Sequence, residues 1–189
     1  SCGGRVYVIG HVRGGAGRGV NTLYCLDSAT GAVIWKYAYD CRSVQGGFGS
    51  TPLDPAGPRA TPATDGVSVY SVSLEGHLFC HNALTGDVVW YRSIPGRLGK
   101  TGGPYGFCSS PILSGNLLMI DIGGILVALD KTSGAELWRR SGGGTTSSMS
   151  VTPTVGPSSL VVFGSSNALG VDMTDRKSTR LNSSHRIRS

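Results

Sequence analysis

A fifteen-residue segment occurs three times in this chain with the same order of side chains. Each copy has a small residue, an Asp or Asn two positions later, a Thr-Gly or Ser-Gly pair and a closing Trp. The copies are LYCLDSATGAVIWKY, LFCHNALTGDVVWYR and LVALDKTSGAELWRR, and their shared residues are Asp27, Gly31 and Trp35, then Asn82, Gly86 and Trp90, then Asp130, Gly134 and Trp138. A repeat with a period near 50 residues restricts the chain to folds built from similar units side by side.

A fourth copy, ALGVDMT, ends at Thr174, because Asp175 and Arg176 stand where the Thr-Gly pair belongs. The segment that follows, DRKSTRLNSSHRIRS, has no strand-like alternation and resembles the translation of a common DNA-sequencing adapter. We therefore expect residues 175–189 to be a non-native or disordered tail, with a solvated basic tail as the alternative. Residues 1–174 would then be the domain itself, a fragment of the kind that metagenomic reads give.

The formal charge of +6 is concentrated in that tail. Residues 175–189 contain five Lys or Arg side chains and one Asp, which leaves a charge of +2 for the rest of the chain. So small an excess does not predict nucleic-acid binding. No apolar run approaches the ~20 residues that a membrane-spanning helix needs, so no transmembrane segment is expected.

Each copy of the motif is preceded by a second repeated piece. RATPATDGVSVYSVSLEGHLFC, CSSPILSGNLLMIDIGGILVAL and SVTPTVGPSSLVVFGSSNALGV each place a Ser/Thr-Pro pair before short apolar runs separated by turn residues. These are strand signals, and no window has the apolar spacing of a helix. In the second copy they predict a strand near Pro62, then strands over residues 67–72, 77–82 and 87–92.

Four strands in about 40 to 50 residues describe one blade of a β-propeller. WD40 blades have the same length, but they end in a Trp-Asp pair, and no Trp of this sequence is followed by Asp. The sequence therefore predicts an all-β fold, a propeller fragment of just under four four-stranded blades whose ring is not closed. A ring of seven or eight blades would need roughly 300 to 400 residues.

The motif also predicts its own local structure. The Asp or Asn side chain of each copy is expected to hydrogen-bond backbone amides in the turn. The Gly is expected at positive φ, which only glycine adopts at little cost. The Trp on the following strand is then expected to lie between neighbouring blades and to hold them together.

The pattern small-x-Asp/Asn-x-x-Thr/Ser-Gly-x-x-x-Trp resembles the tryptophan-docking motif of pyrroloquinoline-quinone-like (PQQ-like) propeller repeats. These repeats occur in quinoprotein alcohol dehydrogenases and in BamB-type lipoproteins of outer-membrane assembly, and the resemblance covers residues 1–174. It implies a bacterial protein of the periplasm or cell envelope, with other proteins and the missing blades of its own propeller as partners.

Five cysteines occur in the chain: Cys2, Cys25, Cys41, Cys80 and Cys108. Cys25 and Cys80 occupy the position that Ala128 takes in the third copy, so we expect small buried hydrophobic residues there. The sequence contains no CxxC pair and no zinc-type spacing of Cys and His. A metal site is therefore not expected.

Four other side chains are catalytic candidates by residue type. His11, His77 and His81 show no triad or metal spacing, and His81 is expected to point into solvent because it alternates with Cys80. Asp121 lies in the apolar run MIDIGG. It is either a functional carboxylate facing the channel or, more commonly for such a residue, a hydrogen-bonded edge or turn residue.

The sequence leaves two main functions open and a third, weaker one. The resemblance implies that a quinoprotein dehydrogenase would hold PQQ in its channel with calcium, an Asp base, a stacking Trp and often a disulfide between adjacent cysteines. This chain has no adjacent cysteines, and all its Trp residues belong to the repeated motif. We therefore expect a noncatalytic BamB-like scaffold with no evident cofactor. The alternative is a fragment of a PQQ-dependent alcohol or sugar dehydrogenase, and a propeller joined to a kinase or other signalling domain is a third, weaker option.

Overall fold

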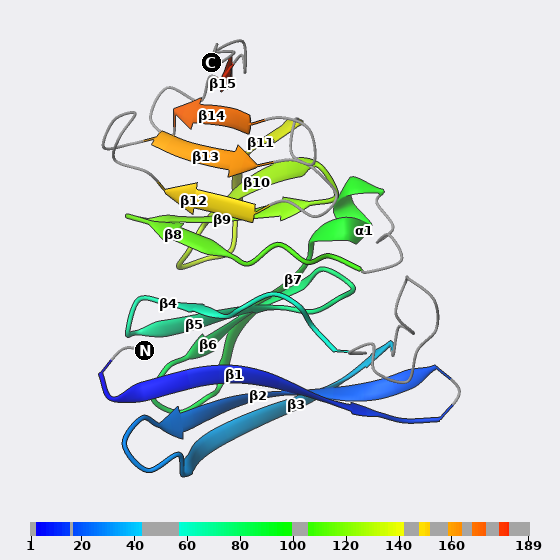
Figure 1. Cartoon of the computed structure of the whole chain (residues 1–189), viewed down its shortest axis with the longest axis vertical. Helices are drawn as coiled ribbons and strands as arrows, with labels where there is room; N and C mark the ends of the chain where they lie inside the picture. The colour runs from blue at the N-terminus through cyan, green and yellow to red at the C-terminus, as the bar shows by residue number, and fades with distance from the viewer. Residues whose placement is uncertain are drawn as a thin grey trace, which may run out of the picture.

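The strands of the computed structural model form four antiparallel sheets that follow one another along the chain (Figure 1). The structure describes residues 3–15, 17–42, 57–99, 106–141, 148–151, 159–163, 168–172 and 178–181. The predicted all-β fold is confirmed: the sheets are the blades of a partial β-propeller whose ring is not closed.

The first sheet has three strands and the other three sheets have four strands each, in the order of the chain. The first contains β1 (Arg5–Arg13), β2 (Arg18–Asp27) and β3 (Val33–Arg42). The second contains β4 (Ala63–Thr64), β5 (Ser68–Val72), β6 (His77–Asn82) and β7 (Val88–Ser93). The third contains β8 (Ile112–Ser114), β9 (Leu117–Ile122), β10 (Ile125–Asp130) and β11 (Glu136–Ser141). The fourth contains β12 (Ser148–Val151), β13 (Ser159–Phe163), β14 (Ala168–Asp172) and β15 (Ser178–Leu181).

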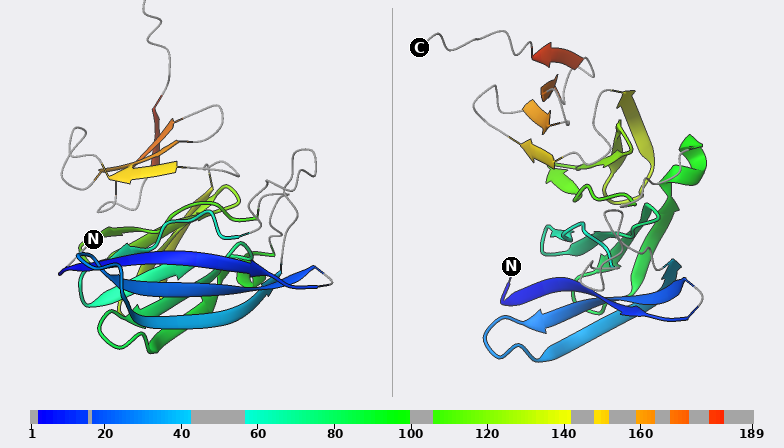
Figure 2. Two further views of the ribbon diagram at one scale, coloured as in Figure 1. Left: turned by 60° about the horizontal axis from the view of Figure 1, so that its bottom comes forward. Right: turned by 45° about the vertical axis from the view of Figure 1, so that its right-hand side comes forward.

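The short first strands of the four-stranded sheets lie next to one another. Strand β8 is in contact with β4 on one side and with β12 on the other. The sheets therefore radiate from the side of the molecule where these three strands meet (Figure 2). The faces of neighbouring sheets are turned toward each other, as in the blades of a propeller.

The small residue of each motif lies directly opposite the Trp of the same copy. Cys25 pairs with Trp35, Cys80 pairs with Trp90, and Ala128 pairs with Trp138. In all three sheets the register shifts immediately after the small residue, which marks a β-bulge. The expectation for Cys25 and Cys80 is confirmed, because both are free thiols with at most 1% of their surface exposed.

The largest core cluster lies between the second and third sheets. It contains Tyr70, Leu78 and Trp90 from the second sheet and Leu118 and Val127 from the third. Side chains of the inner sheets are therefore buried by a neighbouring sheet rather than by a covering layer of helices. The five-residue helix α1 (Ile94–Leu98) is the only helix in the described part of the chain. Within that part, no helix has the length and apolar character needed to cross a membrane.

The expectation that His81 points into solvent is wrong. Its side chain is completely buried. Strand β6 lies inside the second sheet, which packs against the first sheet on one face and the third on the other, so consecutive side chains of β6 from Leu78 to His81 are buried. Alternation along β6 therefore does not separate buried from exposed residues.

Strand β15 lies inside the segment that was expected to be a tail. It pairs antiparallel with β14 and is the fourth strand of its sheet, with Arg180 opposite Leu169. Residues 175–177 and 182–189 lie outside the described part. The division of the chain after residue 174 stays a prediction.

Candidate functional site: the turn contacts between neighbouring sheets

The turn that follows the second-to-last strand has the same hydrogen bonds in all three copies. One side-chain oxygen of the Asp or Asn accepts hydrogen bonds from the amides two and three residues later. Those bonds are Asp27 Oδ1 with Ala29 N and Thr30 N at 3.0 and 2.8 Å, Asn82 Oδ1 with Leu84 N and Thr85 N at 2.8 and 3.1 Å, and Asp130 Oδ1 with Thr132 N and Ser133 N at 3.1 and 2.8 Å. The hydrogen bonds from Thr30 hold the pKa of Asp27 below its ordinary value of 3.8, and those from Ser133 do the same for Asp130.

The glycine of each turn adopts a left-handed backbone conformation. Gly31, Gly86 and Gly134 have φ values of 72°, 80° and 66°. Each of their amides donates to the backbone carbonyl of the Asp or Asn that begins the turn, at 2.8 to 2.9 Å. The turn therefore presents a flat surface without a side chain at this position.

Two indoles lie on these surfaces, each on the turn of the next sheet. Trp35 Nε1 donates to the Ala83 carbonyl at 3.1 Å, and Trp90 Nε1 donates to the Lys131 carbonyl at 3.1 Å. A Cβ atom added to Gly86 would lie 2.7 Å from the Trp35 ring, and one added to Gly134 would lie 2.8 Å from the Trp90 ring. These two positions therefore require glycine for two reasons: its φ is positive, and the indole ring approaches too closely for a Cβ atom.

The Asp27 turn and Trp138 take part in no contact of this kind among the described residues. An added Cβ at Gly31 would meet nothing within 4 Å, so no indole lies on the Asp27 turn. Trp138 is only 8% exposed and packs with Met119, Leu126 and Ala128 of its own sheet. The residues that follow Asp172, where a fourth turn would lie, are outside the described part.

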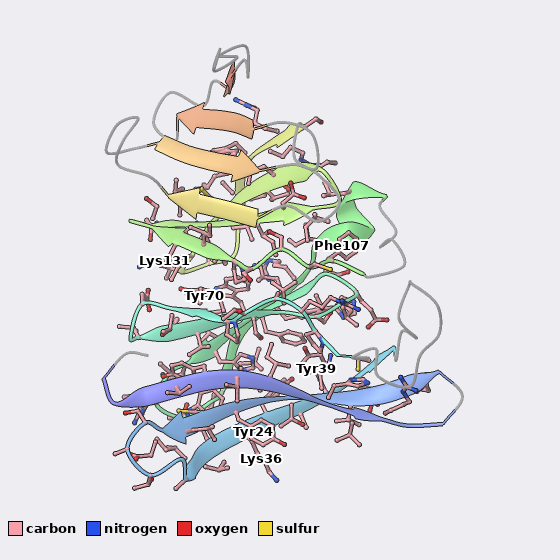
Figure 3. The ribbon with its side chains drawn as sticks, viewed as in Figure 1. Tyr24, Lys36, Tyr39, Tyr70, Phe107 and Lys131 are labelled. Atoms are coloured by element: carbon pink, nitrogen blue, oxygen red, sulfur yellow. The ribbon has the colours of Figure 1, made fainter. Side chains whose placement is uncertain are left out.

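A tyrosine supports each docked indole and was not identified from the sequence. Tyr70 Oη lies 3.2 Å from the Lys131 carbonyl, and its ring centroid lies 6.0 Å from that of Trp90. Figure 3 labels both Tyr70 and Lys131, near the gap between the second and third sheets. Tyr7 has the same position beside Trp35, with Oη 3.4 Å from the Ala83 carbonyl and centroids 5.9 Å apart. The signal was present in the sequence, since both tyrosines precede their motifs in the runs VYV and VYS.

Two further side chains from the second sheet bind the third-sheet turn. Arg92 donates to the carbonyls of Gly134 at 3.0 Å and Ser133 at 2.7 Å. Asp65 forms an ion pair with Lys131 at 2.8 Å. The contact between these sheets therefore combines a buried indole with charged hydrogen bonds at its margin.

The other candidates from the sequence have structural partners. Asp121 is 2% exposed on β9, and its Oδ1 accepts a hydrogen bond from the Gly124 amide at 2.9 Å, as the turn interpretation expects. His11 Nδ1 lies 2.8 Å from Asn21 Oδ1. Among the described residues, no three His, Cys, Asp or Glu side chains are grouped to hold a metal ion.

Neighbouring sheets meet where a Trp of one sheet lies on a turn of the next. This arrangement defines the molecule as part of a propeller of PQQ-like repeats. The sequence profile described as outer membrane protein assembly factor BamB matches residues 21–188. The chain belongs to this family. No curated protein matches the sequence.

The fold is similar to several solved structures. BamB from Moraxella catarrhalis has a TM-score of 0.62 at 20% identity, with 90% of this chain and 52% of BamB covered. Quinohemoprotein alcohol dehydrogenase from Comamonas testosteroni has a TM-score of 0.66 at 17% identity, with 93% and 33% covered. A quinohemoprotein alcohol dehydrogenase from Pseudomonas putida HK5 gives 0.63 at 18% identity, with 90% and 31% covered. This chain thus spans about half of BamB and about a third of the two enzymes, and the likeness shows the fold alone.

Proposed function

We propose that this chain is part of a noncatalytic propeller that serves as a protein-interaction scaffold in the bacterial cell envelope. The observation that carries the proposal is the match of residues 21–188 to the family of an outer-membrane protein assembly factor. The fold is compatible with the role, because propeller blades hold their connecting loops on a rigid frame. The periplasm or cell envelope is the compartment that this family implies.

The alternative is a fragment of a PQQ-dependent alcohol or sugar dehydrogenase, and the similarity to two alcohol dehydrogenases favours it. Such an enzyme would need an indole to stack on the cofactor. In this chain Trp35 and Trp90 lie on turns of neighbouring sheets, and Trp138 packs within its own sheet. These three indoles are engaged within the fold and do not fit the cofactor-stacking role.

One face of the first sheet is turned away from the second sheet. This face favours the proposal that a further blade is a partner of the chain. Val8, Tyr24 and Lys36 lie in one row across this face, and Val8 and Val33 are 40% and 55% exposed. The stick view shows Tyr24 and Lys36 on this side (Figure 3). On the corresponding face of the second sheet, Phe79 and His81 are at most 7% exposed and pack against Tyr37 of the first sheet. We therefore propose that another Trp-bearing blade covers it in the complete ring.

A cofactor test separates the two functions. The purified chain is supplied with PQQ and calcium, and dye-linked oxidation of methanol, ethanol and glucose is followed. The same chain is immobilised and exposed to purified components of an outer-membrane protein assembly complex. The scaffold proposal predicts saturable protein binding and no cofactor-dependent dye reduction. Turnover that requires both PQQ and calcium would overturn it in favour of the dehydrogenase.

A further inference from the structure

One position in the second motif departs from the other two copies. His81 stands where the first and third copies have Leu26 and Leu129. All three residues come directly after the β-bulge, on the same strand of their sheets. Two of the three repeats thus use an apolar side chain here, and the second repeat uses a titratable one.

The His81 ring is enclosed between the first and second sheets. It is completely buried. Its ring centroid lies 4.8 Å from that of Tyr37, 5.8 Å from Phe79 and 6.3 Å from Trp35, with an interplanar angle of 29° to the indole. The indole stacked beside it is the one that lies on the Gly86 turn.

The hydrogen bonds of His81 define its neutral tautomer. Nδ1 lies 3.0 Å from the Gly86 carbonyl, so Nδ1 carries the proton and donates. The other nitrogen, Nε2, is buried, and no hydrogen-bond partner in the described part of the chain reaches it. A second proton would have to sit on Nε2, which is buried with no acceptor among the described residues.

The groups around the ring do not offset that cost. Tyr37 faces it from β3, and Val69 of β5 and Val88 of β7 pair with His81 on either side. In the adjoining turn, Arg5 of β1 donates to the Ala83 carbonyl at 3.1 Å, and Asp87 accepts from Thr85 Oγ1 at 2.7 Å. Burial lowers the pKa of His81 below its ordinary value of 6.5, and the hydrogen bond to Gly86 opposes this only in part.

We propose that His81 makes the contact between the first and second sheets sensitive to acid, so that its protonation releases Trp35 from the Gly86 turn. The charged ring needs solvent, and it reaches solvent only if the aromatic side chains packed on it separate. Because the folded state disfavours the proton, the contact has its full stability above pH 6.5 and loses it as the pH falls toward the folded-state value. The third sheet has Leu129 at this position and does not respond.

Equilibrium unfolding of the full chain between pH 8 and pH 5 tests the proposal, with His81→Leu as the variant that restores the residue of the other copies. His77→Leu, in the same strand but partly exposed, is the matched control. In the unsubstituted chain, protonation of one buried histidine raises the unfolding constant by up to about tenfold per pH unit below 6.5. His81→Leu should remove that component and His77→Leu should keep it. An unchanged acid response in His81→Leu overturns the proposal.

A second measurement applies to the unsubstituted chain and does not depend on a variant that folds. Proton NMR follows the His81 ring and the Trp35 and Trp90 indole N–H signals during the same titration. The proposal predicts that the His81 titration and the loss of the Trp35 indole signal occur together, while the Trp90 signal persists. Titration of His81 without a change at Trp35 overturns it.

Discussion

At the scale of single residues, the three motif glycines distinguish two reasons for glycine: a left-handed backbone conformation and close contact with an indole ring. All three have positive φ, but only Gly86 and Gly134 have an indole on their surface. Gly31 has the same backbone and open space above it. It is therefore an internal control for the cost of the backbone conformation alone.

Alanine substitution of these glycines should give unequal losses of stability. Gly31→Ala places a side chain in the left-handed region, which costs about 1–2 kcal/mol. Gly134→Ala has the same cost and adds a Cβ 2.8 Å from the Trp90 ring. That overlap should add about 1–3 kcal/mol. Urea unfolding of the two variants measures their free energies of unfolding. Equal losses would show that the indole is not in close contact with the turn.

The Trp90 side chain should contribute more than any hydrogen bond near it. It is 7% exposed in the largest core cluster. Trp90→Ala should therefore destabilise the chain by about 3–5 kcal/mol. Trp90→Phe keeps an aromatic ring but loses the donor to the Lys131 carbonyl, and its loss should be smaller. Thermal unfolding compares them, and a melting temperature unchanged by Trp90→Ala would contradict this role.

At the scale of strands and turns, the contact between the second and third sheets is reinforced by an ion pair at its margin, between Asp65 and Lys131. Burial alone would raise the pKa of Asp65, but the hydrogen bonds from Lys131 and from the Ser68 and Val67 amides outweigh it and hold the pKa below 3.8. A carboxylate with a lowered pKa stabilises the fold above its ordinary pKa, and that contribution is lost as the pH falls below about 3.8.

Asp65→Asn should accordingly reduce stability at neutral pH by less than about 1 kcal/mol, because the ion pair lies near the surface. The difference between this variant and the unsubstituted chain should narrow as the pH falls below 3.8, because protonation of Asp65 removes the charge that pairs with Lys131. Urea unfolding at pH 7 and at several pH values below 3.8 checks this. A difference that is the same at every pH would assign the loss to packing rather than charge.

The strands of the second sheet were predictable from local sequence. The expected strands over 77–82 and 87–92 correspond to β6 and β7, because β-branched and apolar residues alternate there between turn residues. Helix α1 follows no apolar period and was not predicted. Local pattern was sufficient for strands and turns because these depend on residues close together in the chain.

The surroundings of individual side chains were less predictable. His81 was wrongly placed in solvent, and Tyr7 and Tyr70 were overlooked beside their indoles. In each case the deciding neighbours belong to another strand or another sheet: Trp35 and Tyr37 enclose His81, and Lys131 accepts the hydrogen bond of Tyr70. Alternation along one strand does not contain that information.

At the scale of the whole molecule, the open face of the first sheet should accept the hairpin that the repeat pattern describes. A peptide of residues 77–93 carries Trp90 on such a hairpin. It should bind the full chain at the Asp27 turn, and a Trp90→Phe peptide should bind more weakly because it lacks the indole donor. Isothermal titration measures both. Binding that is unaffected by Gly31→Ala in the chain would place the peptide elsewhere.

The central claim is that Trp35 and Trp90 hold successive sheets together, because each indole lies on a turn of the next sheet. Hydrogen exchange at the indole N–H groups tests this claim most directly. In the full chain both N–H groups should exchange more slowly than in a short peptide, because each is bonded to a carbonyl of the next sheet. Gly134→Ala should accelerate exchange at Trp90 and leave Trp35 unchanged. Exchange at the peptide rate at both indoles in the unsubstituted chain would contradict the account.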